Sequence, residues 1–190
     1  MDFTVLKTKV FVSPLFFAVL TSLLVIDKTG VSAMAVLFSV LHELGHILAL
    51  ICEKICPKSV FVTPFGINLS LPGNLSTAEK IPVLMAGFTV NFLLAVLFFA
   101  FGKTVSAYVN LIIGIFTAIP IPSTDGGSIL KVLLEEFASQ KSEKIFKIIS
   151  LFFAFIFFVL LIFATVLTKN YFILIAVLYL IFCIIKNAAR

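Results

Sequence analysis

Long apolar runs, separated by short charged segments, make up most of this chain and limit the folds open to it. Six runs are each long enough, or nearly so, to cross about 30 Å of hydrocarbon as a helix. With 62% hydrophobic and only 12% charged residues, the chain cannot be an ordinary soluble domain. We therefore predict an all-α polytopic membrane protein with spans at residues 10–26, 31–51, 81–101, 105–119, 148–167 and 171–185.

The basic residues predict how these spans are oriented. If both ends of the chain are cytoplasmic, three of the fourteen Lys and Arg residues, Lys28, Lys103 and Lys169, fall outside and the other eleven fall inside. No small-x-small cleavage site follows the first run, so we expect a retained span there rather than a signal peptide. The net charge of +5 is not gathered into a basic arm, which argues against a nucleic-acid partner.

Three ionisable side chains, His42, Glu43 and His46, interrupt the second apolar run. Each such group is costly in hydrocarbon by a few kcal/mol, so its presence indicates a functional site. Residues four apart share a helix face, so the two histidines can bind one metal ion, with Glu43 beside them to handle a water molecule. The same pattern on a soluble helix often arises by chance, but the membrane setting favours one zinc ion per chain. Both histidines of the chain lie in this motif.

A catalytic zinc site usually takes three protein ligands, and the chain has no third histidine. The three cysteines lack the spacing of a disulfide framework, and we interpret them as packing or interface residues. Asp125 instead stands at a broken helix end, after Pro120 and before Gly126, on the predicted side of the histidines. Alone, the Asp-Gly-Gly sequence would indicate a routine turn; beside the histidine motif we favour Asp125 as a ligand.

The segment between the second and third runs predicts a short hairpin or re-entrant loop at residues 57–73. Apolar and other residues alternate there around Pro64, Phe65 and Gly66. A free edge of this hairpin could accept an extended substrate segment as an added strand. A plain surface hairpin without a substrate role is an equally good interpretation.

The third run combines a helix start signal with small and polar residues. Ser76 and Glu79 have the spacing of a capping box, which predicts that the helix begins near Thr77. For Gly87 we favour a packing role, whereas Asn91 has two equal interpretations, packing and support of the site. Residues 129–137 predict an interfacial helix, and the last two spans are expected to be scaffold.

The chain resembles the site-2 protease family of intramembrane zinc metalloproteases, peptidase family M50. The resemblance covers about the central half of the chain and rests on segments 42–46, 86–91 and 110–127. It implies that His42, His46 and Asp125 are zinc ligands and that Glu43 is the catalytic acid/base. The Pro64-Phe65-Gly66 sequence further resembles the compact branch that includes the sporulation protease acting on a sigma-factor precursor.

Two positions depart from the family pattern. Thr117 stands where the family commonly has Asn, so an amide that helps to hold substrate is missing there, and Phe88 replaces a frequent Pro. The 190 residues hold no nucleotide-sensing or PDZ domain, so the regulation that these domains give some members is not expected.

These observations together predict a single membrane domain over residues 1–190, with accessory helices at 10–26 and 148–185. The predicted catalytic core at 31–137 holds three core helices, the hairpin at 57–73 and an Asp-Gly-Gly turn. Further candidates for substrate binding or support of the site are Asn91, Pro64, Phe65, Gly66, Pro120 and Gly126. The expected activity is cleavage of a membrane-embedded protein, with a sigma-factor precursor or an anti-sigma factor as candidate substrates. A regulatory membrane protein is a further candidate partner, and a bacterial cell membrane is the expected location. The alternatives are a zinc-binding scaffold without turnover and, less favoured because only one liganding cluster is present, a metal transporter.

Overall fold

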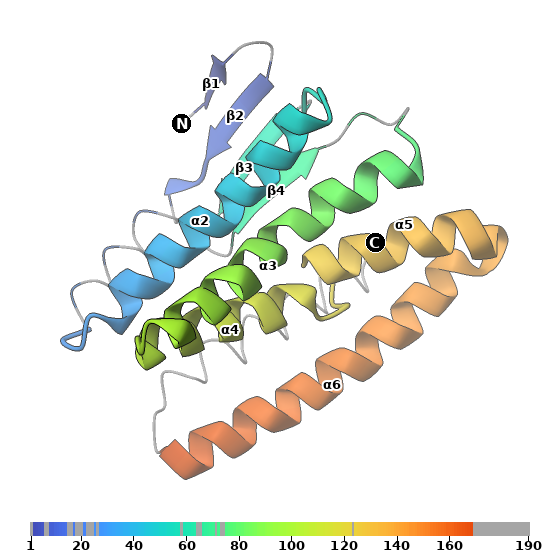
Figure 1. The fold of residues 1–190 in the computed structure, drawn as a ribbon. Helices are drawn as coiled ribbons and strands as arrows, with labels where there is room; N and C mark the ends of the chain where they lie inside the picture. Colours follow the sequence, from blue (N-terminus) through green and yellow to red (C-terminus); the bar gives the residue numbers. More distant parts are fainter. Residues whose placement is uncertain are drawn as a thin grey trace. The chain divides into compact units, whose positions relative to one another are not determined.

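The structure is a computed structural model that describes residues 2–5, 8–14, 17, 21, 25, 27–57, 59–63, 66–70, 72, 75–122 and 124–168. The predicted span at 171–185 and most of the span at 10–26 lie outside these residues. The chain divides into two units, Met1–Thr117 and Ala118–Arg190 (Figure 1). The predicted single domain and its catalytic core at 31–137 remain predictions.

Helix α2 (Val31–Cys52) exposes an apolar stripe and buries its two histidines. Such an arrangement suits hydrocarbon, where the outward face meets lipid and polar groups must find partners inside the protein. At 22 residues the helix is long and apolar enough to cross a membrane, as predicted. The exposed stripe consists of Leu37, Val40, Leu44, Leu48 and Ile51, and the buried face consists of Phe38, His42, Gly45, His46 and Leu50.

Helix α3 (Thr77–Ala100) begins at the predicted residue and packs closely against α2. The Glu79 carboxylate accepts hydrogen bonds from the backbone N–H and the hydroxyl of Ser76, at 2.8 and 2.7 Å. A Cβ atom on Gly45 of α2 would lie 2.9 Å from the Ala86 carbonyl oxygen, so the two backbones approach where small residues face each other.

Helix α4 (Thr104–Ala118) completes the helical part of the first unit. Gly102, with φ of 69°, lies in the short connection from α3. The two helices meet through side chains: the rings of Phe99 and Tyr108 lie 5.3 Å apart, and a Cβ atom on Gly114 would lie 2.9 Å from the Phe92 ring. At 15 residues α4 is shorter than the helices that are long enough to cross a membrane.

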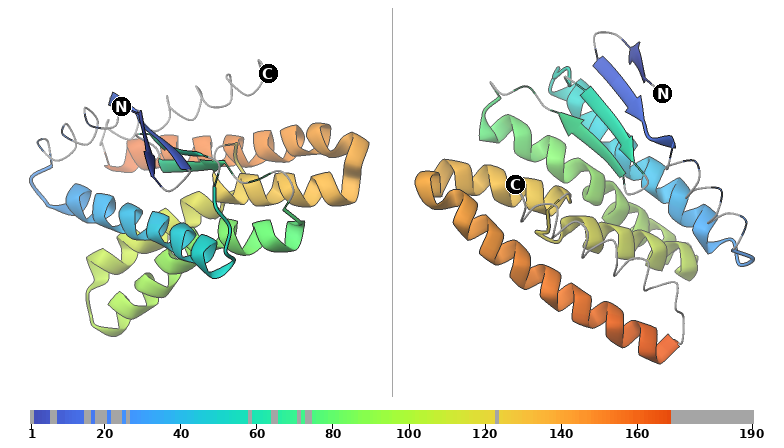
Figure 2. Two further views of the ribbon diagram at one scale, coloured as in Figure 1. Left: turned by 90° about the horizontal axis from the view of Figure 1, so that it is seen from above. Right: turned by 180° about the vertical axis from the view of Figure 1, so that it is seen from behind.

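A four-stranded sheet lies beside α2, which β4 contacts (Figures 1 and 2). The strands follow the order β1-β2-β3-β4; β2 and β3 are parallel, and the outer pairs are antiparallel. The predicted hairpin at 57–73 overlaps the last two strands. Their bounds are β1 (Asp2–Val5), β2 (Thr8–Val12), β3 (Ser59–Thr63) and β4 (Gly66–Ser70).

The N-terminal strands correct the predicted start of the first span at residue 10. Val10 and Val12 belong to β2, where they pair with Val60 and Val62 of β3. These β-branched residues suit a strand, but their apolar character equally suits the start of a membrane helix. The partner strand lies 50 residues further along the chain, beyond the reach of any local pattern.

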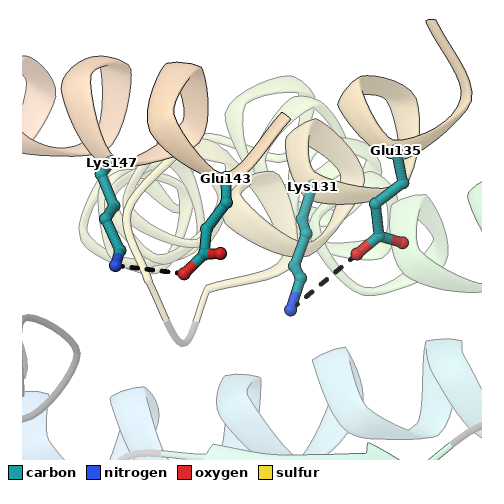
Figure 3. Close-up of polar contacts among 4 residues, drawn as sticks. All are labelled: Lys131, Glu135, Glu143 and Lys147. Atoms are coloured by element: carbon teal, nitrogen blue, oxygen red, sulfur yellow. Dashed lines mark ion pairs between the residues drawn. The ribbon is translucent and has the colours of Figure 1, made fainter. Parts of the chain in front are cut away.

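The second unit contains α5 (Asp125–Ala138), the short 3-10 helix η1 (Ser139–Lys141) and α6 (Ser142–Thr168). Helices α5 and α6 form an antiparallel pair (Figure 2). Exposed ion pairs join Lys131 to Glu135 at 4.0 Å on α5 and Lys147 to Glu143 at 3.1 Å on α6 (Figure 3). Each i, i+4 pair stabilises its helix by about 0.2–0.5 kcal/mol.

The predicted fold class is confirmed in its main feature, a mostly helical membrane protein. Among the described residues, α2, α3 and α6 are long and apolar enough to cross a membrane. The predicted interfacial helix at 129–137 lies within α5, which begins four residues earlier, at Asp125. The number of six spans remains a prediction.

Candidate metal centre

The two predicted histidine ligands lie together on the buried face of α2. His42 and His46 are 4% and 3% exposed, and their Nε2 atoms are 3.3 Å apart. Two ligands bound to one tetrahedral zinc ion at about 2.0–2.1 Å would stand about 3.3 Å apart. The spacing of the two nitrogens therefore fits one zinc ion between them.

The other ring nitrogen of His46 contacts a backbone carbonyl of α3. Nδ1 of His46 lies 2.7 Å from the carbonyl oxygen of Val83, which is itself fully buried. A carbonyl oxygen can only accept a hydrogen bond, so Nδ1 carries the proton in the neutral ring and Nε2 carries the lone pair. This is the tautomer that a metal ligand needs.

Nδ1 of His42 contacts a side-chain amide instead. It lies 2.6 Å from Oδ1 of Asn91, whose Nδ2 donates to Oδ1 of Asn110 at 3.1 Å. Nδ2 of Asn110 donates in turn to the Ser106 carbonyl oxygen at 2.9 Å. Both asparagines are fully buried. Of the two interpretations of Asn91, the contact with His42 favours support of the site.

Gly87 of α3 faces the two Nε2 atoms. A Cβ atom at this position would lie 2.5 Å from Nε2 of His42 and would also collide with Nε2 of His46. Its bare backbone therefore leaves open the space into which both nitrogens point, and any larger residue would fill it. The packing role favoured from the sequence omits this second function of the glycine.

Glu43 follows His42 on α2 and is half-buried. It differs in this from its neighbour Leu44, which is exposed on the apolar stripe. The Glu43 side chain is therefore partly covered by the protein and partly exposed.

Asp125 lies in the second unit as the first residue of α5, rather than in the turn predicted for the Asp-Gly-Gly sequence. Thr124 explains the difference, because its hydroxyl oxygen accepts the Gly127 N–H at 3.1 Å and caps the helix. The same hydroxyl donates to the carbonyl oxygen of Ile121 at 2.7 Å. A carboxylate in the first turn is stabilised by the helix dipole, which suits an anionic ligand.

The segment before α5 is tightly folded against its own backbone and against α6. A Cβ atom on Gly126 would collide with the carbonyl of Ala118, so this predicted site residue is required for packing. Ile121 and Ala154 of α6 are buried against each other, which holds the segment around the half-buried Pro120.

The remaining sequence candidates have varied positions. Pro64 and Phe65 lie outside the described residues, and Gly66 opens β4. Cys52 and Cys56 are exposed free cysteines. The Thr117 hydroxyl donates to the carbonyl oxygens of its own helix at Ile113 and Gly114, at 3.0 and 3.3 Å.

Sequence reasoning assigned no role to Asn110 or to the Val83 carbonyl. A fully buried amide within the apolar run 105–119 was an available signal for Asn110, because polar side chains in a membrane helix require partners. The Val83 carbonyl had no signal in the sequence, since every residue carries the same group.

Comparisons with known proteins relate the chain to one family model and to one solved fold. The model of Peptidase family M50 matches residues 103–161, and no curated protein sequence matches the chain. Among solved structures, the Site-2 Protease from Methanocaldococcus jannaschii is similar, with a TM-score of 0.67 and 20% sequence identity over 100% of this chain and 94% of that chain. The family-model match covers less than a third of the chain, and the structural similarity shows its fold. The resemblance to the compact branch stays a prediction. The predicted resemblance to the site-2 protease family is confirmed: this chain has the fold of a site-2 protease and matches Peptidase family M50 over residues 103–161.

Proposed function

We propose that the protein is an intramembrane zinc metalloprotease that cleaves a peptide bond within or near the transmembrane segment of another membrane protein. The observation that carries this proposal is the buried histidine pair on an apolar helix, with Nε2 atoms 3.3 Å apart. Imidazoles within a membrane helix are energetically costly, so their presence indicates a function. The open space at Gly87 and the Nδ1 contacts of both rings support a metal-binding role.

His42, His46 and Asp125 are the residues that would hold the zinc ion. Two imidazoles and one carboxylate are a ligand set of catalytic zinc sites, which leave one position for water or substrate. Asp125 is supported by its place in the segment that matches Peptidase family M50 and by its position in the first turn of α5. When bound, zinc supplies Lewis-acid activation of water and of the scissile carbonyl.

Glu43 would act as the general acid/base. Its carboxylate takes the proton of the attacking water and later delivers it to the leaving amine, so that one residue serves both half-reactions. The half-buried position beside His42 supports this role. The apolar stripe of α2 would face lipid and keep bulk water from the reacting groups on that side.

The substrate would bind in an extended form. An intact transmembrane helix already pairs its backbone amides internally, so it must unwind before one of them can be attacked. Strand β4 ends the described sheet on one side, and its outer edge is suited to accept an unwound segment as an added strand. Addition at an edge would hold several residues extended through main-chain hydrogen bonds alone.

The positive-inside rule supports a cytoplasmic site. With both termini in the cytoplasm, α2 runs from the outer to the inner face and its histidines lie in the cytoplasmic half. Sigma-factor precursors and anti-sigma factors are candidate substrates because of the Pro64-Phe65-Gly66 sequence.

A zinc-binding scaffold without turnover is the competing function. The presence of Glu43 beside His42 favours the enzyme, because bound metal alone needs no neighbouring base. Measuring zinc in the purified full chain separates the ligands from the base. We expect about one zinc per chain in the wild type and in Glu43→Gln, and loss of zinc in His42→Ala, His46→Ala and Asp125→Ala. Full zinc content in the histidine variants would refute the proposed site.

A further inference from the structure

We infer that Asn110 is a positioning residue that fixes the tautomer of His42. Asn110 does not contact His42 itself but acts through Asn91, which bonds to both. The inference rests on the zinc site proposed above. It concerns three helices, because His42 lies on α2, Asn91 on α3 and Asn110 on α4.

The direction of each hydrogen bond follows from the Ser106 carbonyl oxygen, which stands at one end of the series and cannot donate. The Ser106 carbonyl oxygen can only accept, so the atom of Asn110 that contacts it at 2.9 Å must be the amide nitrogen. The amide oxygen of Asn110 then faces Asn91 and can only accept from it, at 3.1 Å. Asn91 in consequence presents its nitrogen to Asn110 and its oxygen to His42.

This series of hydrogen bonds ends at the imidazole ring of His42. Because Oδ1 of Asn91 can only accept, Nδ1 of His42 carries the proton and Nε2 carries the lone pair. The Phe38 carbonyl, 3.4 Å from Nδ2 of Asn91, supports the same orientation more weakly. A reversed amide at either asparagine would set two donors or two acceptors against each other in a fully buried site.

Burial makes this orientation effective. Both asparagines are fully buried, so no water can replace a lost partner at low energetic cost. Partners of this kind on a metal-bound histidine typically change metal affinity by about 10–100-fold. Asn110 acts through one intervening neutral hydrogen bond, so its loss should lower zinc affinity by about two- to tenfold.

His46 is an internal reference for the test. Its Nδ1 contacts the Val83 backbone carbonyl, which no side-chain substitution at Asn91 or Asn110 removes. Because the chain has only two histidines, labelling with 15N-histidine gives signals from these two rings alone. Two-dimensional NMR of the imidazole nitrogens then reports the tautomer of each ring separately.

The experiment compares the zinc-free full chain in nanodiscs for the wild type, Asn110→Leu, Asn91→Leu and Asn91→Asp. Thr89→Val is the matched control, because it removes an exposed hydroxyl of α3 that donates to the Met85 carbonyl oxygen of the same helix. We expect Nδ1–H in both rings of the wild type. Asn110→Leu and Asn91→Leu should each give a mixture of tautomers in His42, while His46 keeps Nδ1–H alone. Asn91→Asp should retain Nδ1–H in His42.

Zinc affinity, measured by competition with a chromogenic chelator, should fall in the order wild type, Asn110→Leu, Asn91→Leu. Unchanged His42 signals and unchanged affinity in a folded Asn110→Leu protein would overturn the inference. Equal changes in both histidines would also overturn it, because they would indicate general loosening of the helices. If Asn91→Leu fails to fold, Asn110→Leu carries the test. The tautomer is read without zinc or substrate, so a protein that cleaves nothing would still give this result.

Discussion

The Cβ position of Gly87 lies 2.5 Å from Nε2 of His42, so α3 presents bare backbone to the nitrogens proposed to bind zinc. Close helix packing alone would be satisfied by a glycine at Gly45, where the α2 backbone approaches Ala86. Gly87 has the additional effect of keeping a space open, which links the packing of two helices to metal binding.

Gly87→Ala should therefore remove zinc binding while leaving most of the fold in place. The added methyl group must displace one or both rings, and we expect zinc affinity to fall by about 100-fold or more, beyond the loss of a single supporting hydrogen bond. Zinc content of the purified variant, with circular dichroism to check helicity, measures this directly.

Gly114→Ala is the matched control for that change. It also places a methyl group against a neighbour in a buried helix, 2.9 Å from the ring of Phe92, but it does not approach either histidine. We expect lower thermal stability with wild-type zinc content. Equal loss of zinc in both variants would mean that Gly87 acts only through packing.

The outer edge of β4 gives a second prediction. Thr63 of β3 and Gly66 of β4 are partners, and two residues separate them in the sequence. The residue pair that closes a two-residue connection exchanges backbone hydrogen bonds. Hydrogen-bonded and non-hydrogen-bonded pairs alternate along an antiparallel ladder, so Leu69 falls in a non-hydrogen-bonded pair with Val60 and its N–H points away from β3. Leu69→Pro should lower kcat/KM by about two- to tenfold, because one main-chain bond to an added strand is lost.

Thr4→Pro tests the opposite edge of the same sheet. Val5 and Thr8 form the corresponding closing pair of β1 and β2, so the Thr4 N–H also points outward. If substrate adds to β4, cleavage by this variant stays at the wild-type rate. Unchanged cleavage by a folded Leu69→Pro protein would instead argue against strand addition. Val62 is unsuited to the test, since it pairs with both β2 and β4.

The start of α3 predicts an effect on stability alone. Ser76→Ala removes the hydroxyl that donates to Glu79 at 2.7 Å and should lower the free energy of unfolding by about 1 kcal/mol. For a chain of this length the melting temperature should fall by about 2–4 °C. Glu79→Gln retains an acceptor oxygen and should have a smaller effect. A fall in zinc content in either variant would contradict a purely structural role.

Asp27, which precedes α2, predicts a pH dependence of stability. Hydrogen bonds from the Thr29 hydroxyl and from the backbone N–H groups of Ser32 and Thr29 lower the pKa of this carboxyl from 3.8 to about 2. Because the folded value is the lower one, the stabilisation is present above about pH 4 and is lost as the pH falls through about 2.

Asp27→Asn imitates the protonated carboxyl and provides the comparison. The variant should melt below the wild type near neutral pH, and the difference should shrink as the pH approaches 2. A difference that is the same at all pH values would show that charge on Asp27 does not contribute.

The parts of the site that were predictable are those within one helix. The spacing of His42 and His46 requires only the periodicity of α2, and their place in an apolar run supplied the functional meaning. The start of α3 at Ser76 and Glu79 was predictable for the same reason, because a capping box is local.

The parts that were missed depend on contacts between distant segments. The pairing of β2 with β3 and the hydrogen bonds from His42 through Asn91 to Asn110 join residues that no periodic pattern relates. Asp125 was misplaced in a turn because two glycines normally weaken a helix, whereas the Thr124 cap starts one there.

The central claim is that the protein hydrolyses peptide bonds at a membrane, and it is tested most directly by comparing protein N-termini in membranes of cells that express the wild type or Glu43→Gln. Both proteins must be present at equal levels and with equal zinc content. We predict new N-termini within or beside transmembrane segments, found with the wild type alone. The same termini with Glu43→Gln, or none with the zinc-loaded wild type when candidate sigma-factor precursors and anti-sigma factors are co-expressed, would contradict the proposed activity.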